Sequence, residues 1–173
     1  MKKKLLLPLM ALVLALSFIM TACADEDKDD DDEEDSTPKY EIPIEGYFKA
    51  METGSEKEVK KVFCEAEIKK KIEENGDDYF KERAEDLNEM MEDEYGENLK
   101  VTYKVKDKDK LDDDDLEEYS QQMQRRCDDD DLEVTEGYKV KIEAKIKGDE
   151  GDDKNSITYY VGKVDGKWII LDI

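Results

Sequence analysis

The C-terminal stretch ITYYVGKVDGKWIILDI, residues 157–173, decides the fold class. Every second residue from Ile157 to Val161 is apolar, which predicts a β-strand with one buried face. Asp165-Gly166 then predicts a type I′ turn, because both central positions of that turn need positive φ. The run Trp168–Leu171 is apolar at every position, so we expect a central strand that is covered on both faces.

Two earlier segments have the same two-residue period. Apolar residues alternate with lysine or glutamate over residues 138–147, and with lysine or threonine over residues 99–106. We expect two half-buried strands whose lysines face water. Between the elements, we expect a turn at residues 107–110 and an acidic loop at residues 148–155.

Apolar residues three and four positions apart predict helices elsewhere. The first predicted helix is short and contains Ile44, Tyr47, Phe48 and Met51. A second is expected from a capping box at Ser55 to about residue 74.

Two further helices complete the pattern. One is expected from Asp77 or Asp78 to Tyr95, where Gly96 supplies an end signal. The other is expected over residues 113–126, because its acidic start and basic end suit the helix dipole. Helices, a strand, a helix and then strands predict an α+β domain with a mainly antiparallel sheet.

This order, closed by the hairpin VGKVDGKWIILDI at residues 161–173, resembles a known family. It resembles the cystatin-like cone of the nuclear transport factor 2-like superfamily, which occurs in many small bacterial lipoproteins. The resemblance covers roughly residues 42–173 and implies N-terminal helices packed on a curved, mainly antiparallel sheet. The superfamily includes enzymes, binding modules and accessory domains, so the resemblance implies no activity and carries over no catalytic residue.

The N-terminus has the layout of a secretory signal. Lys2–Lys4 precede the uncharged run Leu5–Met20, and small residues follow. The run is shorter than the ~20 residues that a membrane-spanning helix needs, although a short transmembrane anchor is the alternative. The segment Ile19–Cys23 resembles a bacterial lipobox, with Met20 in place of the usual leucine. The resemblance implies that Cys23 receives a diacylglycerol group and that cleavage removes residues 1–22.

A chain anchored at Cys23 would lie on the cell membrane, outside the cytoplasm, and we expect a Gram-positive cell surface. Residues 25–35 hold ten acids and one lysine, a block of like charge that is typical of disorder. We therefore interpret residues 23–39 as the lipidated cysteine and an acidic spacer. A partner-binding acidic tail is the alternative. Residues 40–173 remain as a single α+β domain.

The whole chain is strongly acidic, with 28 basic and 50 acidic side chains, no histidine and a formal net charge of −22. The lack of histidine excludes Ser-His-Asp triads, Cys-His dyads and zinc sites that need imidazole. The excess of acid argues against nucleic acid as a partner. It favours basic or cationic partners by complementarity alone. We expect no cofactor and no catalytic residue.

Two cysteines remain after maturation, Cys64 and Cys127. A disulfide between them is permitted outside the cytoplasm and would stabilise the fold by ~4 kcal/mol. Two unpaired buried thiols are the alternative. Acidic runs at 112–115, 128–131 and 149–153 invite a calcium interpretation, but their spacing is not that of an EF-hand. We interpret them as helix caps and loops and predict no metal site.

These observations predict a membrane-anchored lipoprotein with a non-catalytic binding or envelope-accessory domain. Its expected partners are the membrane, through the lipid anchor, and an unidentified envelope protein or small ligand. The alternatives are a small-molecule-binding cone and a small hydrolase or isomerase that uses the same cavity. A cavity of ~300 Å³ or more with convergent polar groups would favour these alternatives, whereas a filled interior favours the first function.

Overall fold

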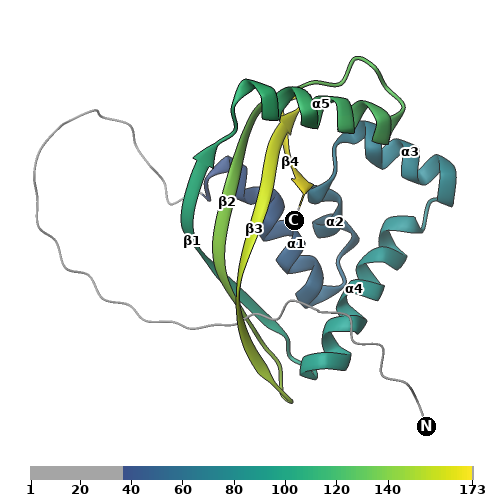
Figure 1. Ribbon diagram of the computed structural model, residues 1–173. Coiled ribbons are helices and arrows are strands. Elements are labelled where there is room, and N and C mark those ends of the chain that lie inside the picture. The colour runs from purple at the N-terminus through teal and green to yellow at the C-terminus, as the bar shows by residue number, and fades with distance from the viewer. Residues whose placement is uncertain (1–36, 173) are drawn as a thin grey trace, which may run out of the picture.

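The structure is a computed structural model that describes residues 37–172 (Figure 1). The predicted leader, Cys23 and most of the predicted spacer lie outside the described residues. The described chain has the predicted α+β class. Its helical elements are η1 (Lys39–Glu41), α1 (Ile42–Thr53), α2 (Glu56–Val59), η2 (Lys60–Val62), α3 (Glu65–Asn75), α4 (Tyr79–Tyr95) and α5 (Asp113–Cys127). Within residues 37–172, no helix is long and apolar enough to cross a bilayer.

The sheet is antiparallel and open, with strands in chain order. Its members are β1 (Lys100–Lys110), β2 (Val134–Lys147), β3 (Asp152–Val164) and β4 (Lys167–Asp172). Asp165 and Gly166 have φ values of 50° and 78°, which confirms the predicted turn with positive φ at both positions. The longest pairing joins β2 to β3, and it aligns Val140 with Tyr159 and Ile142 with Ile157.

Helix α1 covers one face of this sheet and forms the main core with it (Figure 1). Ile44 and Phe48 of α1 pack against the apolar residues of β2 and β3. The ring of Phe48 meets that of Tyr159 edge-on, with centroids 6.1 Å apart, and Tyr159 is only 1 % exposed. This layer is therefore filled by interlocking aromatic and branched side chains.

Helix α5 packs against the opposite face, at one end of the sheet (Figure 1). Met123 of α5 joins a second core with Val164 and Ile169. Two glycines, Gly137 and Gly162, pair across β2 and β3 beneath this layer. Their missing side chains let the second core pack closely on the strands, since a Cβ at either position would overlap a neighbouring leucine.

A third cluster holds the helices together away from the sheet. Phe80, Ala84 and Leu87 of α4 pack against Ala50 of α1 and Val59 of α2. The first predicted helix is therefore confirmed as α1, which extends beyond the predicted residues 44–51 at both ends. The third and fourth predicted helices are confirmed as α4 and α5.

The prediction of one continuous helix from Ser55 to residue 74 is wrong. The chain leaves the helix after η2, and Phe63 and Cys64 are extended, with ψ values of 149° and 166°. Phe63 stacks edge-on against Phe80 at 5.3 Å, whereas Cys64 is buried in the second core. Adjacent residues must enter different cores, and an extended backbone makes their side chains point in opposite directions.

Two predicted connections are also wrong in extent. Residues 107–110 continue β1 after a bulge between Val105 and Asp107, so they are strand and not turn. The predicted acidic loop at 148–155 is shorter, because β3 already begins at Asp152. Asp152 pairs with Lys147 across the strands, and such opposite charges support an extended pairing that the acidic sequence alone does not suggest.

The last strand is covered on both faces as predicted, but the prediction that it lies at the centre of the sheet is wrong. β4 lies at the edge of the sheet and pairs with β3 alone. Ile169 enters the second core and Ile170 enters the main core. η2 and the start of α3 lie beside the open edge, where Lys167 Nζ is 2.7 Å from a carboxylate oxygen of Glu65. Helices supply the cover that the sequence pattern attributes to neighbouring strands.

We expect Gly162→Ala to destabilise the protein by about 1–3 kcal/mol, because the added Cβ would overpack the second core. It would lie 2.6 Å from Leu171 Cδ1 and 2.7 Å from Val134 Cγ1. The midpoint of urea unfolding measures the loss. Gly151→Ala is the matched control, since its Cβ would lie 3.6 Å from the Tyr95 ring. Equal midpoints for the two variants would contradict the packing argument.

Candidate functional site

The face of the sheet opposite α1 carries a lysine-rich surface beyond the region covered by α5. Cross-strand register places the lysines of β1, β2 and β3 on the same side, because directly paired residues share a face. We call this surface the basic face. It consists of Lys100, Lys104, Lys106, Lys139, Lys141, Lys145, Lys147 and Lys154.

Four carboxylates lie among these eight lysines, at Asp107, Asp109, Glu143 and Asp152. Glu143 is central, with an oxygen 3.1 Å from Lys106 Nζ and 3.0 Å from Lys154 Nζ. Hydrogen bonds from these two lysines lower the pKa of Glu143. Its charge therefore persists at neutral pH and orders the ammonium groups around it.

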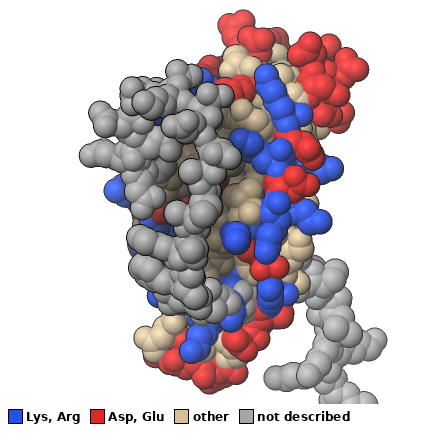
Figure 2. All heavy atoms as spheres, turned by 90° about the vertical axis from the view of Figure 1, so that its left-hand side faces the viewer, with Lys and Arg blue, Asp and Glu red and all other residues tan. Residues whose placement is uncertain are grey.

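The remaining lysines of the basic face have more freedom. Lys100, Lys104, Lys141 and Lys147 are exposed and have no ion pair within the described part of the chain. Figure 2 shows the side of the molecule on which β1 lies, with a column of basic side chains between acidic ends. A domain with a large acidic excess thus presents one elongated surface where lysines outnumber acids two to one. Such a surface attracts an extended anionic chain.

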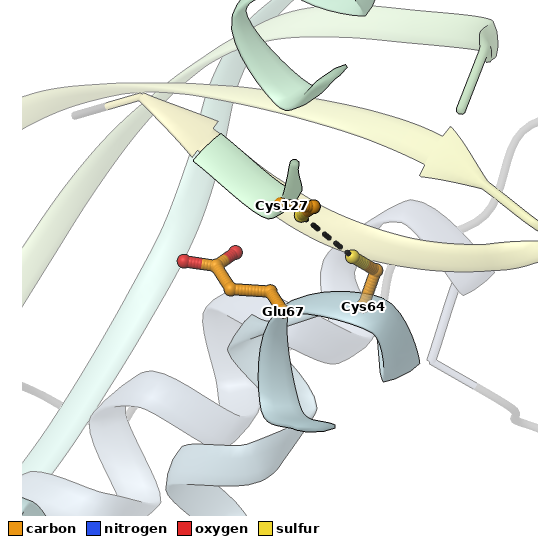
Figure 3. Close-up of side chains that lie close together, drawn as sticks. All are labelled: Cys64, Glu67 and Cys127. Atoms are coloured by element: carbon orange, nitrogen blue, oxygen red, sulfur yellow. Dashed lines mark hydrogen bonds between the residues drawn. The ribbon is translucent and has the colours of Figure 1, made fainter. Parts of the chain in front are cut away.

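A second cluster lies buried where α3 meets α5 (Figure 3). Cys64 precedes α3 as its N-cap residue, and Cys127 is the last residue of α5. Their Sγ atoms lie 3.9 Å apart, although the residues are 63 positions apart in the chain. Both are free thiols in the structure and both are buried. The fold thus places the two predicted disulfide partners side by side, with the sulfurs farther apart than in a bond of ~2.05 Å.

Glu67 is the third member of this cluster, one turn into α3 (Figure 3). It is 3 % exposed, and one of its oxygens lies 2.9 Å from Nη2 of Arg126, which is the residue before Cys127. Burial raises the pKa of Glu67, and the Arg126 charge opposes that shift. Burial, followed by the neighbouring Cys64, raises the pKa of Cys127 to about 12. Its thiolate is therefore scarce at neutral pH, which makes Cys127 a poor nucleophile.

Metal coordination is the main chemical alternative for this cluster. One ligand atom from each of Cys64, Glu67 and Cys127 falls within 4.8 Å of the others, a grouping that suits a thiolate-binding metal. However, the guanidinium of Arg126 already neutralises Glu67. Coordination would also need the Cys127 thiolate, whose formation burial opposes. The arrangement therefore suits a disulfide better than a metal ion.

The acidic runs act as helix termini and loops in the described structure. Asp112 caps α5, since its Oδ1 accepts a hydrogen bond of 3.0 Å from the Asp115 backbone N–H. Asp128 ends the same helix in the left-handed conformation, with φ of 57°. Within residues 37–172, these runs do not bring three potential ligand atoms together.

Several hollows lie on the surface and not in the layer beneath α1. One of about 380 Å³ is lined by Lys69, Glu73 and Cys127, and another of about 430 Å³ by Leu116, Ser120 and Val134. A third of about 350 Å³ lies beside Trp168. None of these three is lined by Phe48 or Tyr159, the aromatic residues that fill the main core.

Sequence analysis singled out the two cysteines but missed Glu67, Arg126 and the basic face. No local pattern marks Glu67, because its burial depends on α5, which lies far along the chain. The signal for the basic face was present, as lysines at alternate positions of predicted strands. This alternation predicts only that the lysines face water, because it does not give the register that brings the lysines of different strands together.

No family model, no curated protein and no solved structure matches this chain.

We expect Cys64 and Cys127 to form a disulfide in protein isolated from an oxidising compartment. Intact mass should fall below that of the reduced chain by two hydrogen atoms. The double variant Cys64→Ser/Cys127→Ser should unfold with ~4 kcal/mol less stability, because the bridge restricts the unfolded chain. Wild-type protein in reducing agent is the matched control and should unfold close to the variant. Two alkylatable thiols in the oxidised, denatured protein would contradict the pairing.

Proposed function

We propose that this protein is a membrane-anchored lipoprotein outside the cytoplasm whose domain binds an extended anionic partner through the basic face. The N-terminal pattern that ends at Cys23 supports the anchor. The basic face carries the binding proposal, because a surface where lysines outnumber acids two to one attracts anions even though the whole chain is acidic. The domain is non-catalytic in this proposal.

The shape and charge of the basic face indicate what kind of partner it would bind. The lysines extend along three strands, and those of β2 run over nine residues from Lys139 to Lys147, so the surface is about 30 Å long. Acidic residues bound it, with Asp112–Asp115 after β1 and Asp149–Asp153 near its start. These ends repel broad anionic surfaces, whereas a narrow chain can lie between them. An acidic polypeptide or other linear polyanion of the envelope fits this chemistry.

The interior supports a surface-binding module over a small-molecule cone or a small enzyme. Aromatic rings pack the layer between α1 and the sheet. The centroid of the Phe48 ring lies 5.4 Å from that of Tyr103 and 6.1 Å from that of Tyr159. A helix-covered antiparallel sheet is compatible with the proposed cystatin-like cone, but its centre is filled. Glu67 is a described carboxylate whose pKa is raised. It forms an ion pair with Arg126 and lies beside the two buried thiols.

Neutralising the basic face should weaken binding of fluorescent poly-glutamate by roughly tenfold, since three exposed charge contacts each contribute ~0.2–1 kcal/mol. Fluorescence anisotropy with the full chain in detergent, at low and high salt, measures the change. Binding should weaken at high salt for the wild type. The variant combines Lys104→Gln, Lys141→Gln and Lys147→Gln.

A control with the same change in net charge removes three exposed lysines from the helices. It combines Lys57→Gln, Lys69→Gln and Lys81→Gln. We expect this control to change the affinity far less than the variant of the basic face. If both variants bind poly-glutamate equally well, net charge and not the basic face governs binding, and the proposal is wrong.

The anchor is tested at Cys23. Cys23→Ala removes the sulfur that would carry the acyl chains, so the protein should leave the membrane fraction. Cell fractionation with immunoblotting measures this shift, and intact mass shows whether wild-type protein carries lipid. Ala22→Gly is the matched control because it keeps a small residue and the acceptor thiol. Unchanged membrane association of the Cys23 variant would contradict lipid anchoring.

A further inference from the structure

We propose that the acidic segment of this same chain, residues 25–35, occupies the basic face when no partner is bound. This inference rests on the proposed function of the basic face and adds its regulation. A partner would then bind by displacing the segment. Two observations support the proposal: the match of charge and length, and the place where the chain enters the domain.

The acidic segment matches the basic face in charge and in length. Its ten acids and one lysine face a surface of eight lysines and four acids. The basic face is longest on β2, where its lysines run over nine residues from Lys139 to Lys147, or ~30 Å. The segment has eleven residues and reaches ~36 Å when extended, so it can span these lysines from end to end. Each of the two has an excess of one charge, and contact between them reduces the repulsion within each.

The domain begins beside β1. Tyr40 in η1 lies under Lys108, whose Nζ is 4.5 Å from the centroid of the Tyr40 ring. The same ring lies 5.3 Å from that of Tyr138, the residue that pairs with Lys110 at the end of β1. Four residues, 36–39, separate Asp35 from Tyr40. They reach ~13 Å, which is enough to pass the edge strand and enter the basic face from that end.

Because the acidic segment is covalently connected to the domain, weak contacts are sufficient to keep it on the basic face. A short linker raises the effective concentration of an attached segment to the millimolar range. A free polyanion must therefore exceed the attached segment in charge or length in order to bind. The basic face would thus discriminate against short acidic peptides and respond to long polyanions.

Zero-length carbodiimide cross-linking of the full chain in detergent tests the contact directly, because it joins only carboxylates and amines that touch. We expect links from residues 25–35 to the lysines of β1 and β2 within monomeric protein. Links to Lys57, Lys69 and Lys81 on the helices should be rare. The links should disappear at 1 M salt, where screening acts within ~3 Å. Links spread evenly over all lysines, or found only in cross-linked dimers, would overturn the proposal.

The chain contains a matched pair of acidic runs for a second test. Residues 29–32 and residues 128–131 are each four consecutive aspartates. Changing all four to asparagine removes the same charge, but the second run lies at the end of α5, away from the basic face. We expect the 29–32 variant to bind poly-glutamate several-fold more tightly than the 128–131 variant. Asparagine also suits position 128, whose backbone is left-handed.

The outcomes separate this inference from the proposed function. If both aspartate variants bind poly-glutamate equally well, the segment does not compete, and the inference is wrong although the basic face still binds. If the triple lysine variant binds as tightly as wild type, the proposed function itself is wrong. The inference gains support when cross-links fall on the basic face and only the 29–32 variant binds more tightly.

Discussion

The alternation of side chains across β2 and β3 is the constraint on which the rest of the structure depends. Val140 and Ile142 face α1 and build the main core, while the alternating Lys139 and Lys141 face away. Because the period of a strand is two, the same register that fills the core also assembles the basic face. A slip of one residue would exchange lysine for isoleucine in the core, so the register is strongly specified.

This constraint explains how a chain with a net charge of −22 presents a basic surface. Most acids lie on the helices, in the loops and in the N-terminal segment. The lysines alternate with apolar residues in the strands. Lysine on β1 also protects an open sheet edge against pairing with another chain, so the basic face has a structural role besides the proposed binding. Net charge describes solubility, whereas recognition depends on the charge of a single face.

The two helical layers meet around β4, and the buried cysteines lie at that meeting point. Cys64 caps the start of α3 and Cys127 ends α5, and both side chains belong to the second core. A bond between them would tie α5 to α3. The nearby pair of Glu67 and Arg126 links the same two helices by charge. The thiols and the ion pair therefore have a structural explanation that is separate from the proposed binding by the basic face.

The sequence alone determined the α+β class, the terminal hairpin, and the helices α1, α4 and α5, because these depend on local periodicity, caps and turn residues. It also marked both cysteines. Tertiary structure alone decided that Phe63 and Cys64 interrupt a helix, that β4 is an edge strand, and that Glu67 is buried. Each depends on contacts with residues distant in the chain, which outweigh local preference. The basic face lies between these cases, since the sequence supplied its lysines and only strand register brought them together.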